Sequence, residues 1–402
     1  MNIGLVGHVD HGKTTLTERL SGKWTDTHSE ELKRGITIKL GYADTTFYRI
    51  PGKKGAEQYT TKRLDAETKQ ENEPIMKVSF VDAPGHESLM AVMLSGATIM
   101  DGALLLIAAN ERCPQPQTKE HLMALELSGI EKIVVVQNKI DLVTSERAQR
   151  NYEQIKEFLK DTKFKDAPIV PISAQRGVNI DALIEVMLAT FTVPERDPKA
   201  DPLMVVARSF DVNKPGATPE QLKGGVLGGA LKQGKLSVGD KVEIRPGRVV
   251  EEANKIVAKP LTTTIVGIVT GGEHVKEIVP GGSVAIMTSL DHSVVRADLL
   301  TGCVVGHKGK LPPIWDELYL ATTLLERVVG SAEELKVNPL LKNEMLMLNV
   351  NSSTTVGIVT EVSKKGVRCR LRKPVCAEKG ARVAISRRVG TRFRLIGYGI
   401  IQ

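Results

Sequence analysis

The pattern of apolar segments changes at one point in the chain, and this change constrains the fold more than any other feature. Before residue 192, continuous apolar segments alternate with segments of helical periodicity, which predicts a parallel sheet covered by helices on both faces. After residue 198, short Val- and Ile-rich segments are separated by Gly, Pro, Asn and Asp, which predicts antiparallel β-barrels. Residues 192–198, rich in Pro and charge, are typical of a linker. We expect strands at 2–6, 77–81, 102–109, 132–136 and 168–172, and helices at 13–20, 87–96, 117–127, 145–161 and 181–190.

A second break, at residues 308–313, divides the strand-rich half into two pieces of about 100 residues each, a size typical of one domain. The sequence therefore predicts three domains, at residues 1–199, 200–309 and 310–402. Residues 50–73 are polar and charged and lie between two strands of the first domain, so we expect a long exposed excursion there. In the strand-rich half, strands are expected at 203–210, 239–244, 262–270 and 282–287.

Composition is that of a soluble globular protein. Hydrophobic residues make up 41% of the chain and charged residues 25%, which excludes a disordered polypeptide. The longest apolar run, residues 103–109, is too short to span a bilayer, and the chain enters a strand-like segment at once, which leaves no room for a signal peptide. The 4 cysteines lie far apart and outside CxxC pairs, which argues against a disulfide scaffold. We expect a cytoplasmic protein with no membrane partner.

The net charge of +8 is concentrated near the end of the sequence. Residues 361–402 hold 12 Lys and Arg against 2 Asp and Glu, whereas residues 1–200 hold 26 against 28. In residues 367–372 apolar and basic side chains alternate, so a strand would present three arginines on one face. The functional interpretation is contact with an RNA backbone, and the alternative is a solvated strand that only aids solubility. The candidate RNA-binding residues are Arg368, Arg370, Arg372, Arg382, Arg387 and Arg388.

A phosphate-binding motif follows the first predicted strand. Residues 7–14 read GHVDHGKT, which fits the pattern GxxxxGK[ST] between a strand and a helix. Backbone N–H groups of such a loop wrap a phosphate chain, Lys13 would reach the β and γ phosphates, and the Thr14 hydroxyl would ligate Mg²⁺. The alternative, a glycine-rich turn without a ligand, is disfavoured because the motif lies between a predicted strand and a predicted helix.

The tetrapeptide NKID at residues 138–141 predicts which base is bound. The Asp141 carboxylate can accept hydrogen bonds from both N1–H and the exocyclic amine of guanine, whereas adenine offers no such pair of donors. Asn138 would bridge the base and the phosphate loop, and the stem of Lys139 would lie across the purine. Ser173 and Ala174, at the end of the last predicted strand of the first domain, could meet guanine O6 through backbone N–H groups. We therefore expect the nucleotide to be GTP.

Two further loops carry residues suited to sensing the terminal phosphate. Asp82 ends the strand at 77–81 and can hold Mg²⁺ through water, and the Gly85 N–H can bond a γ-phosphate, so this loop would respond to hydrolysis. Thr37 lies in the stretch RGITI at residues 34–38 and would reach Mg²⁺ only in the triphosphate state. All these loops follow parallel strands, at whose carboxyl ends open α/β sheets bind ligands.

The motifs GHVDHGKT, RGITI, DAPGH, NKID and SA together resemble those of the translational GTPases related to elongation factor Tu. The resemblance implies an α/β P-loop GTPase domain with a mostly parallel, doubly wound sheet, followed by two all-β barrel domains. It also implies hydrolysis of GTP to GDP and phosphate at a low intrinsic rate. Stretches at 23–41, 136–139, 208–216, 222–226 and 325–330 further resemble the γ subunit of archaeal and eukaryotic translation initiation factor 2.

The γ-subunit resemblance covers nearly the whole chain and implies partners as well as an activity. The family forms a heterotrimer with α and β subunits, with α on the second domain and β on the GTPase domain. The heterotrimer binds methionylated initiator tRNA and delivers it to the small ribosomal subunit, where GTP hydrolysis triggers release.

The resemblance also implies residue roles by position. His86 matches the histidine that positions the attacking water. The family carries a Cys-rich zinc knuckle between its two switch regions, but residues 52–74 of this chain contain no cysteine, so we expect GTP or GDP and Mg²⁺ as cofactors, without zinc. The implied Mg²⁺ residues are Asp10, Thr14, Thr37 and Asp82, and the implied nucleotide-binding residues are Asp10, His11, Gly12, Lys13, Thr14, Thr15, Gly85, Asn138, Lys139, Asp141, Ser173, Ala174 and Gln175.

Three other classes of protein share parts of this pattern. The selenocysteine-specific elongation factor shares the GTPase motifs but usually bears an additional C-terminal domain. The GTPase subunit of sulfate adenylyltransferase has the same domain order but no need for the basic surface predicted near residues 361–402. A P-loop kinase is disfavoured by the NKID motif and by the predicted barrels.

Overall fold

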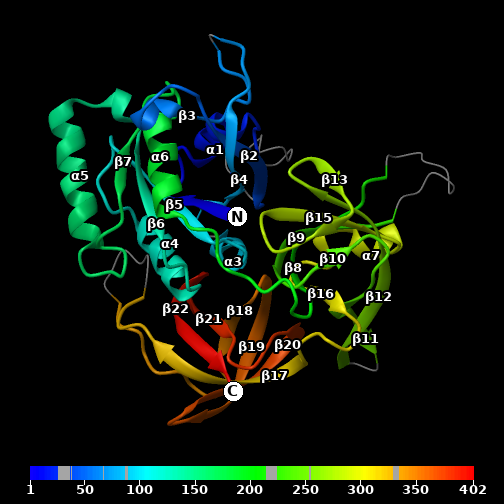
Figure 1. Ribbon diagram of the computed structural model, residues 1–402. Helices are drawn as coiled ribbons and strands as arrows, with labels where there is room; N and C mark the ends of the chain where they lie inside the picture. The colour runs from blue at the N-terminus through cyan, green and yellow to red at the C-terminus, as the bar shows by residue number, and fades with distance from the viewer. Residues whose placement is uncertain are drawn as a thin grey trace. The chain divides into compact units, whose positions relative to one another are not determined.

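The computed structural model describes residues 1–25, 37, 39–66, 68–86, 89–213, 224–252, 255–328 and 335–402 (Figure 1). The chain divides into two compact units, Met1–Pro194 and Glu195–Gln402. The first unit holds the α/β fold and the second holds two β-barrels, which confirms the fold class predicted from the sequence. The domain boundaries predicted after residues 199 and 309 stay predictions. In the part of the chain that is described, no helix is long and apolar enough to cross a membrane.

A seven-stranded sheet forms the centre of the first unit, in the order β3-β2-β4-β1-β5-β6-β7. The strands from β4 to β7 in this order run parallel, and β1, β5 and β6 are buried along their whole length, as expected for strands covered on both faces. The bounds are β1 Asn2–Gly7, β2 Gly41–Arg49, β3 Tyr59–Thr60, β4 Glu73–Asp82, β5 Gly102–Ala108, β6 Ile133–Asn138 and β7 Ile169–Pro171.

Strands β2 and β3 were not predicted by the apolar segments of the sequence. β2 runs antiparallel beside β4, and β3 runs antiparallel beside β2. Along β2 only Gly41, Ala43 and Phe47 are buried. A strand that buries so few of its side chains needs no continuous apolar run, and for this reason a search for such runs misses it.

Helices α1 and α6 cover one face of this sheet. Leu16 and Leu20 of α1 and Leu183 of α6 belong to one core together with Ile3 and Leu5 of β1. Helix α4 lies against β1 and β5 and packs on α3, and its buried residues lie outside that core, so it covers the opposite face. All the predicted helices are confirmed within a few residues, although positions 87 and 88 of the predicted 87–96 helix lie outside the described residues. The bounds are α1 Lys13–Ser21, α3 Met90–Ala97, α4 Pro116–Leu127, α5 Ser145–Leu159 and α6 Ile180–Thr190.

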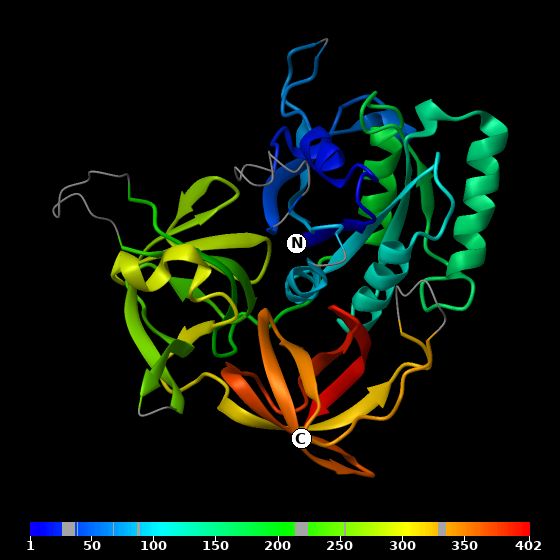
Figure 2. The ribbon, with the colours of Figure 1, turned by 180° about the vertical axis from the view of Figure 1, so that it is seen from behind.

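The excursion between β2 and β4 is exposed along most of its length but is held by contacts of its own. Its 3₁₀ helix η1 (Gly55–Gln58) and β3 pack against α6, and Tyr59 packs against the core of the sheet. Nearer the tip, Asp65 accepts from the backbone N–H of Thr68 at 2.7 Å, and Asn72 Nδ2 donates to the Lys62 carbonyl at 3.0 Å. These contacts give the segment a defined path (Figure 2), which its sequence alone did not predict.

The first barrel of the second unit closes through six strands in the order β11-β16-β8-β9-β15-β12, with β12 paired back to β11. Its core is formed by inward-facing Val, Ile and Leu side chains, among them Val206, Leu227 and Ile265. The bounds are β8 Leu203–Phe210, β9 Val226–Gln233, β10 Leu236–Ser237, β11 Lys241–Glu252, β12 Lys255–Thr270, β13 Glu273–Val275, β14 Glu277–Ile278, β15 Ser283–Thr288 and β16 Val304–His307, with the short helices α7 His292–Val295 and η5 Arg296–Asp298.

The second barrel is closed in the order β17-β20-β19-β18-β21-β22. Alternate residues of its strands face a core that includes Leu318, Leu346, Val359 and Ile385. Closure pairs both edges of each strand in the two six-stranded rings. The bounds are β17 Ile314–Leu324, β18 Met345–Val350, β19 Ser353–Ser363, β20 Gly366–Cys376, β21 Arg382–Val389 and β22 Arg392–Ile401.

Candidate functional site

The predicted phosphate loop connects β1 to α1 at the carboxyl edge of the parallel strands. Gly12 has a left-handed backbone (φ 88°), and an ideal Cβ at this position would lie 2.4 Å from Asn138 Nδ2, so only glycine fits. Lys13 Nζ donates to the carbonyl oxygens of Gly7 at 2.9 Å and His8 at 2.7 Å. Because the Lys13 side chain is only 6% exposed, its ammonium is largely removed from water, and a bound anion would offset that loss.

Three of the residues predicted to bind Mg²⁺ come together beside the phosphate loop. The Thr14 hydroxyl donates to Asp82 Oδ2 at 2.9 Å and lies 3.3 Å from the Thr37 hydroxyl. Thr25, which the sequence analysis did not single out, donates to the same carboxylate oxygen at 2.7 Å. Hydroxyl and carboxylate oxygens are the ligands that Mg²⁺ prefers, and it binds with few protein ligands when phosphates and water supply the rest. The residues present therefore fit a Mg²⁺ ion next to bound phosphate.

The remaining predicted metal and phosphate residues are less tightly placed. Asp10 is exposed, with a left-handed backbone (φ 62°), and Thr15 is half-buried in the first turn of α1. Of the predicted first switch, only Thr37 lies among the described residues. Within the described ranges no three His, Cys, Asp or Glu side chains gather as a metal-binding group. The expected absence of zinc and the Mg²⁺ role of Asp10 stay predictions.

The loop after β4 lies directly against the phosphate loop. An ideal Cβ on Gly85 would lie 2.6 Å from Lys13 Nζ and 2.9 Å from the Val9 backbone nitrogen. Any side chain at this position would therefore collide with the group expected to hold the phosphates. His86 follows it, half-buried, and its carbonyl accepts from the Leu89 N–H at 2.9 Å. The structure thus brings the Gly85 backbone to the phosphate loop, and the catalytic role of His86 stays a prediction.

Asn138, the last residue of β6, joins two of the predicted loops. Its Nδ2 donates to the carbonyl of His11 in the phosphate loop at 2.9 Å, and its Oδ1 accepts from the Ala174 N–H at 3.0 Å. The Ser173 N–H donates to the Val178 carbonyl at 3.2 Å. Both amides predicted to meet guanine O6 therefore have partners within the protein, and the Ala174 N–H would have to share or exchange its partner to bind the base.

The other predicted base-binding residues surround this junction. Lys139 follows Asn138 with a left-handed backbone (φ 64°) that turns the chain into the 3₁₀ helix η3, Ile140–Leu142. Asp141 within that helix is exposed, and Gln175 is exposed in the loop after β7. The structure therefore brings the NKID and SA motifs to the edge of the sheet that carries the phosphate loop.

Two buried histidines support the phosphate loop from within. His11 Nδ1 donates to the Leu106 carbonyl at 2.9 Å, and its Nε2 lies 3.3 Å from Glu111 Oε2. His121 of α4 accepts the Gly7 N–H on Nδ1 at 2.8 Å. Burial lowers the pKa of His121 to about 3 and the pKa of His11 to about 4. The His121 ring is neutral at pH 7, as its acceptance of the Gly7 N–H requires. His121 lies 114 residues beyond Gly7, and no local sequence signal could have identified it.

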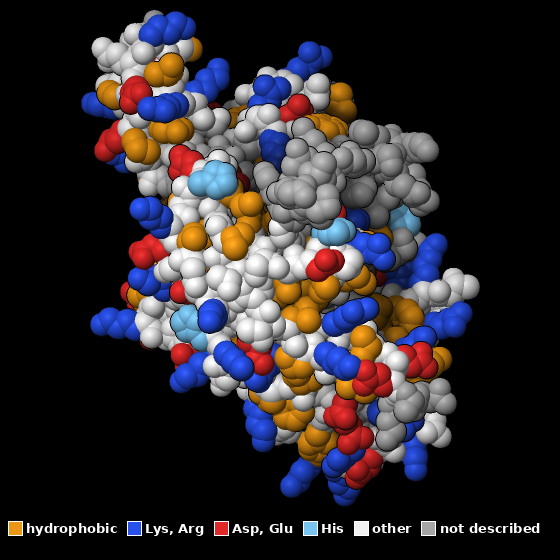
Figure 3. Space-filling view, turned by 90° about the vertical axis from the view of Figure 1, so that its right-hand side faces the viewer, with side chains coloured by type: hydrophobic (Ala, Val, Ile, Leu, Met, Phe, Trp, Pro, Cys, Tyr) orange, Lys and Arg blue, Asp and Glu red, His pale blue; other side chains and the backbone are white. Residues whose placement is uncertain are grey.

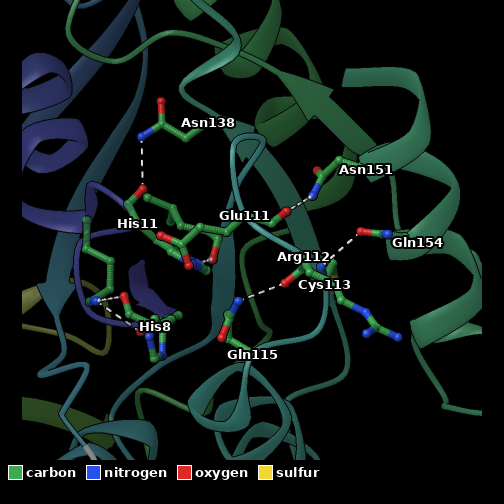
Figure 4. A network of polar contacts seen from close by, with 12 residues as sticks. His8, His11, Glu111, Arg112, Cys113, Gln115, Asn138, Asn151 and Gln154 are labelled. Atoms are coloured by element: carbon green, nitrogen blue, oxygen red, sulfur yellow. Dashed lines mark hydrogen bonds and ion pairs between the residues drawn. The ribbon is translucent and has the colours of Figure 1, made fainter. Parts of the chain in front are cut away.

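A chain of polar contacts continues from the phosphate loop to helix α5, as Figure 4 shows. Glu111, which faces the His11 ring, accepts on its backbone carbonyl from Asn151 Nδ2 at 2.9 Å. Two residues further on, the Cys113 N–H donates to Gln154 Oε1 at 3.1 Å. Asn151 and Gln154 both belong to α5, so the loop between β5 and α4 ties the phosphate loop to that helix.

The candidate RNA-binding arginines fall into two groups. On β20 the predicted alternation is confirmed, because Val367, Cys369 and Leu371 are buried whereas three arginines are exposed. We call Arg368, Arg370 and Arg372 the arginine row. Within it, Arg368 forms ion pairs with Glu317 at 3.2 Å and Glu361 at 3.4 Å.

The arginines of β21 are engaged within the barrel itself. Arg387 binds the Glu344 carboxylate and donates to the carbonyls of Asn338 at 2.7 Å and Pro339 at 3.0 Å, with a side chain only 17% exposed. Arg382 lies over the ring of Tyr398, 4.7 Å from its centroid, and Arg388 Nε donates to the Gly390 carbonyl at 3.3 Å. Arg387 is thus held by internal partners, whereas the arginine row faces solvent. On the face drawn in Figure 3, basic and acidic side chains lie interspersed.

Known proteins match this chain along its whole length. The family model for the elongation factor Tu GTP binding domain matches residues 1–193, and the model for the C-terminal part of initiation factor eIF2 gamma matches residues 316–401. Proteins named translation initiation factor 2 subunit gamma align with all 402 residues. Identities are 58% in Archaeoglobus fulgidus, 57% in Methanothermobacter thermautotrophicus and 56% in Pyrococcus horikoshii, over 94%, 98% and 97% of those proteins.

Solved structures share the fold at lower identity. A bacterial selenocysteine-specific elongation factor superposes on the whole chain with a TM-score of 0.75 and 23% identity, and the match covers 58% of that protein. The elongation factor SelB from Methanococcus maripaludis, solved with the GTP analogue GPPNHP, superposes with a TM-score of 0.71 and 24% identity over 78% of its chain. These likenesses support the order of an α/β domain followed by two barrels.

Proposed function

Since the chain belongs to the translation initiation factor 2 subunit gamma family of translational GTPases, we propose that it carries methionylated initiator tRNA to the small ribosomal subunit, in the cytoplasm and together with α and β subunits. GTP hydrolysis to GDP and phosphate would release the tRNA. The observation that carries the proposal is the identity of 54–58% to γ subunits over all 402 residues. The α subunit would bind the second domain and the β subunit the GTPase domain.

Lys13 and the phosphate loop would bind the triphosphate. The Lys13 ammonium already has carbonyl partners that fix its position, so a bound phosphate would meet a charge that needs no further reorganisation. The backbone N–H groups at the start of α1 would add donors at the positive end of the helix dipole. The neutral His121 ring supports this arrangement because it accepts the Gly7 N–H and orients that peptide.

Thr14, Asp82 and Thr37 would hold Mg²⁺ beside the β and γ phosphates. When bound, this ion supplies positive charge that offsets the charge developing on the phosphates during transfer. The Thr14 and Thr25 hydroxyls both donate to Asp82 Oδ2 and hold that carboxylate in one orientation. Thr37 lies on a different segment from Thr14, so its contact would be sensitive to whether a γ-phosphate is present.

Asp141 and the SA loop would select guanine, and His86 would act on the attacking water. The exposed Asp141 carboxylate would accept two hydrogen bonds from guanine, a pattern that adenine cannot satisfy. Next to Gly85, the His86 imidazole would orient the water for attack on the γ-phosphate. The half-buried position of His86 fits a side chain that moves into the site only when hydrolysis is triggered, which would keep intrinsic turnover low.

The arginine row would contact the backbone of an RNA. Its three guanidinium groups lie on one strand face, and guanidinium binds phosphate in a bidentate geometry. Such contacts add affinity that is independent of base sequence. The choice of initiator over elongator tRNA would therefore come from other parts of the factor.

Equilibrium binding of methionylated initiator tRNA tests this proposal. The full chain is assayed with and without its α subunit, in a non-hydrolysable GTP analogue and in GDP, with an elongator aminoacyl-tRNA as the control. We expect tight binding only for initiator tRNA and only in the triphosphate state. Equal binding of both tRNAs, or no dependence on the nucleotide, would contradict the proposed function and leave only a GTPase.

A further inference from the structure

Arg19, in the last turn of α1, reaches the loop that follows β7. Its Nε donates to the Ala174 carbonyl at 2.9 Å, and its Nη2 donates to the Gln175 carbonyl at 2.7 Å. One guanidinium group thus binds two consecutive carbonyls of the SA loop. A cation near the C-terminus of α1 is also favoured by the helix dipole.

The same loop is held from its other side by Asn138. The Ala174 N–H donates to Asn138 Oδ1 at 3.0 Å, and Ser173 and Val178 exchange backbone hydrogen bonds of 3.2 and 3.0 Å that close the turn. The peptide nitrogen of Ala174 is therefore fixed by β6, and its carbonyl is fixed by α1. Removal of Arg19 would leave only the first of these two constraints.

The carbonyl contacts determine where the amides of the loop point. In a trans peptide the C=O and the next N–H point in opposite directions. When Arg19 holds the Ala174 carbonyl, it therefore directs the Gln175 N–H away from α1. In the same way, its hold on the Gln175 carbonyl orients the Arg176 N–H, which donates to Ser173 Oγ at 3.2 Å.

We propose that Arg19 is a positioning residue for guanine recognition: by holding the Ala174 carbonyl it directs the Gln175 N–H of the SA loop toward the guanine O6, beside the Ala174 N–H that Asn138 fixes. The inference rests on the nucleotide site proposed above. It adds that helix α1 connects the phosphate-binding end of that site to its base-binding end. Helix α1 begins with Lys13 and Thr14 at the phosphates and ends with Arg19 at the base loop. One rigid helix therefore sets the distance between the two ends of the nucleotide site.

Nucleotide analogues with and without O6 separate this role from a general structural one. Full-length Arg19→Ala and Arg19→Lys variants are compared with the wild type for binding of GDP, inosine diphosphate and the diphosphate of 2-aminopurine riboside. Inosine keeps O6 and N1–H and lacks the 2-amino group, whereas 2-aminopurine riboside keeps the 2-amino group but lacks O6 and the N1 proton, so its baseline affinity is lower and only the change caused by each variant is compared. Glu18→Ala, at the adjacent exposed position of α1, is the matched control.

We expect Arg19→Ala to weaken GDP and inosine diphosphate about 3- to 10-fold, the loss of one or two partly exposed charge-assisted hydrogen bonds. Binding of the 2-aminopurine diphosphate should not change, because no O6 is present for the loop to meet. For GDP and inosine diphosphate, the affinity of Arg19→Lys should lie between those of the wild type and Arg19→Ala, since one ammonium cannot bind both carbonyls in the geometry of the guanidinium fork. The Glu18→Ala control should match the wild type.

An equal loss for all three nucleotides would overturn the proposal and make Arg19 a general stabiliser of the domain. Unchanged binding of all three by both Arg19 variants would overturn it as well. These outcomes are distinct from failure of the proposed nucleotide site. If the wild type bound ADP as tightly as GDP, the guanine assignment itself would fail, whatever the Arg19 variants did.

Discussion

The nucleotide site and the arginine row use charge in opposite ways. At the nucleotide site, Lys13 and Asp82 are buried: Lys13 donates to two carbonyls of the phosphate loop, and Asp82 accepts from the Thr14 hydroxyl. In the arginine row, Arg370 and Arg372 are exposed on a strand whose other face fills the core of a barrel. The first arrangement can specify one ligand through geometry. The second offers charge density with little geometric constraint.

The difference predicts how each region responds to change. A buried, preorganised charge contributes strongly to ligand affinity and is weakly screened by salt. Its removal should therefore cause a large loss of affinity for that one ligand. An exposed row of charges contributes to RNA affinity through the release of counterions. Its removal should therefore cause a smaller loss of affinity, and the size of that loss should depend on ionic strength. Variants in the two regions should therefore fail in different ways.

The largest effect is expected for Lys13→Ala. Removal of the buried ammonium should weaken GTP binding about 30- to 4,000-fold, since truncation of a buried hydrogen-bonded charge pair costs about 2–5 kcal/mol. Equilibrium titration with a fluorescent GTP analogue measures this loss. Lys23→Ala, an exposed lysine after α1, is the control and should bind normally. A Lys13→Ala variant with wild-type affinity would place the phosphates elsewhere.

A smaller effect is expected for His86→Ala, on the rate of GTP hydrolysis and not on GTP affinity. If His86 orients the attacking water, its loss should slow hydrolysis about 100-fold while GTP affinity stays unchanged. Single-turnover hydrolysis with excess protein measures the chemical step even when intrinsic turnover is low. His274→Ala on β13 serves as a matched control. Wild-type turnover in the His86 variant would remove its catalytic role.

Replacement of the arginine row should cause a modest loss of tRNA affinity and should make the remaining affinity less dependent on salt concentration. Joint replacement of Arg368, Arg370 and Arg372 by Ala should lower tRNA affinity about tenfold and reduce the slope of log affinity against log salt by about 0.7–0.9 per arginine. The same positions replaced by Lys keep the charge and should keep the slope. An unaltered slope in the Ala variant would mean that the row is only solvated.

The smallest effect at neutral pH is expected for His121→Asn, because Asn can still accept the Gly7 N–H. His121 has a pKa of about 3 in the folded protein and 6.5 as its ordinary value, so the unfolded chain binds one more proton between these limits. Stability should therefore be fully present above pH 6.5 and fall as pH is lowered toward 3, by about 1.4 kcal/mol per pH unit for this group.

Urea unfolding between pH 7 and pH 4 measures this dependence. The free energy of unfolding of His121→Asn should change less steeply with pH than that of the wild type, whereas an exposed His274→Asn control should follow the wild type. Identical pH dependence in the variant and the wild type would show that His121 binds protons equally in the folded and the unfolded chain, so that burial does not lower its pKa.

Much of the nucleotide site could be predicted because its motifs follow parallel strands. The carboxyl ends of such strands meet at one edge of a sheet, so residues as far apart as Lys13, Asp82 and Asn138 converge once the strand order is right. The alternation on β20 was predicted for an equally local reason, since side chains of a strand point to opposite faces.

The contacts that the sequence did not predict depend on tertiary structure. Arg19, Thr25 and His121 act through partners on other elements, and nothing in their local sequence marks them. A local argument can also mark a residue as a surface charge when tertiary contacts hold it elsewhere. The sequence marks Arg387 as a basic surface residue, but in the structure it pairs with Glu344 inside the fold. Strand β2 was missed because only Gly41, Ala43 and Phe47 along it are buried.

The most direct test of the nucleotide site is the base preference of Asp141→Asn. An amide at this position can no longer accept both hydrogen bonds from guanine, but it can donate to the 2-oxo group of xanthine. Calorimetric titration should show GDP bound about 100-fold more weakly and xanthosine diphosphate more tightly than in the wild type. If the ratio of the two affinities stayed that of the wild type, Asp141 would not read the base, and the assignment of the site to guanine nucleotides would be wrong.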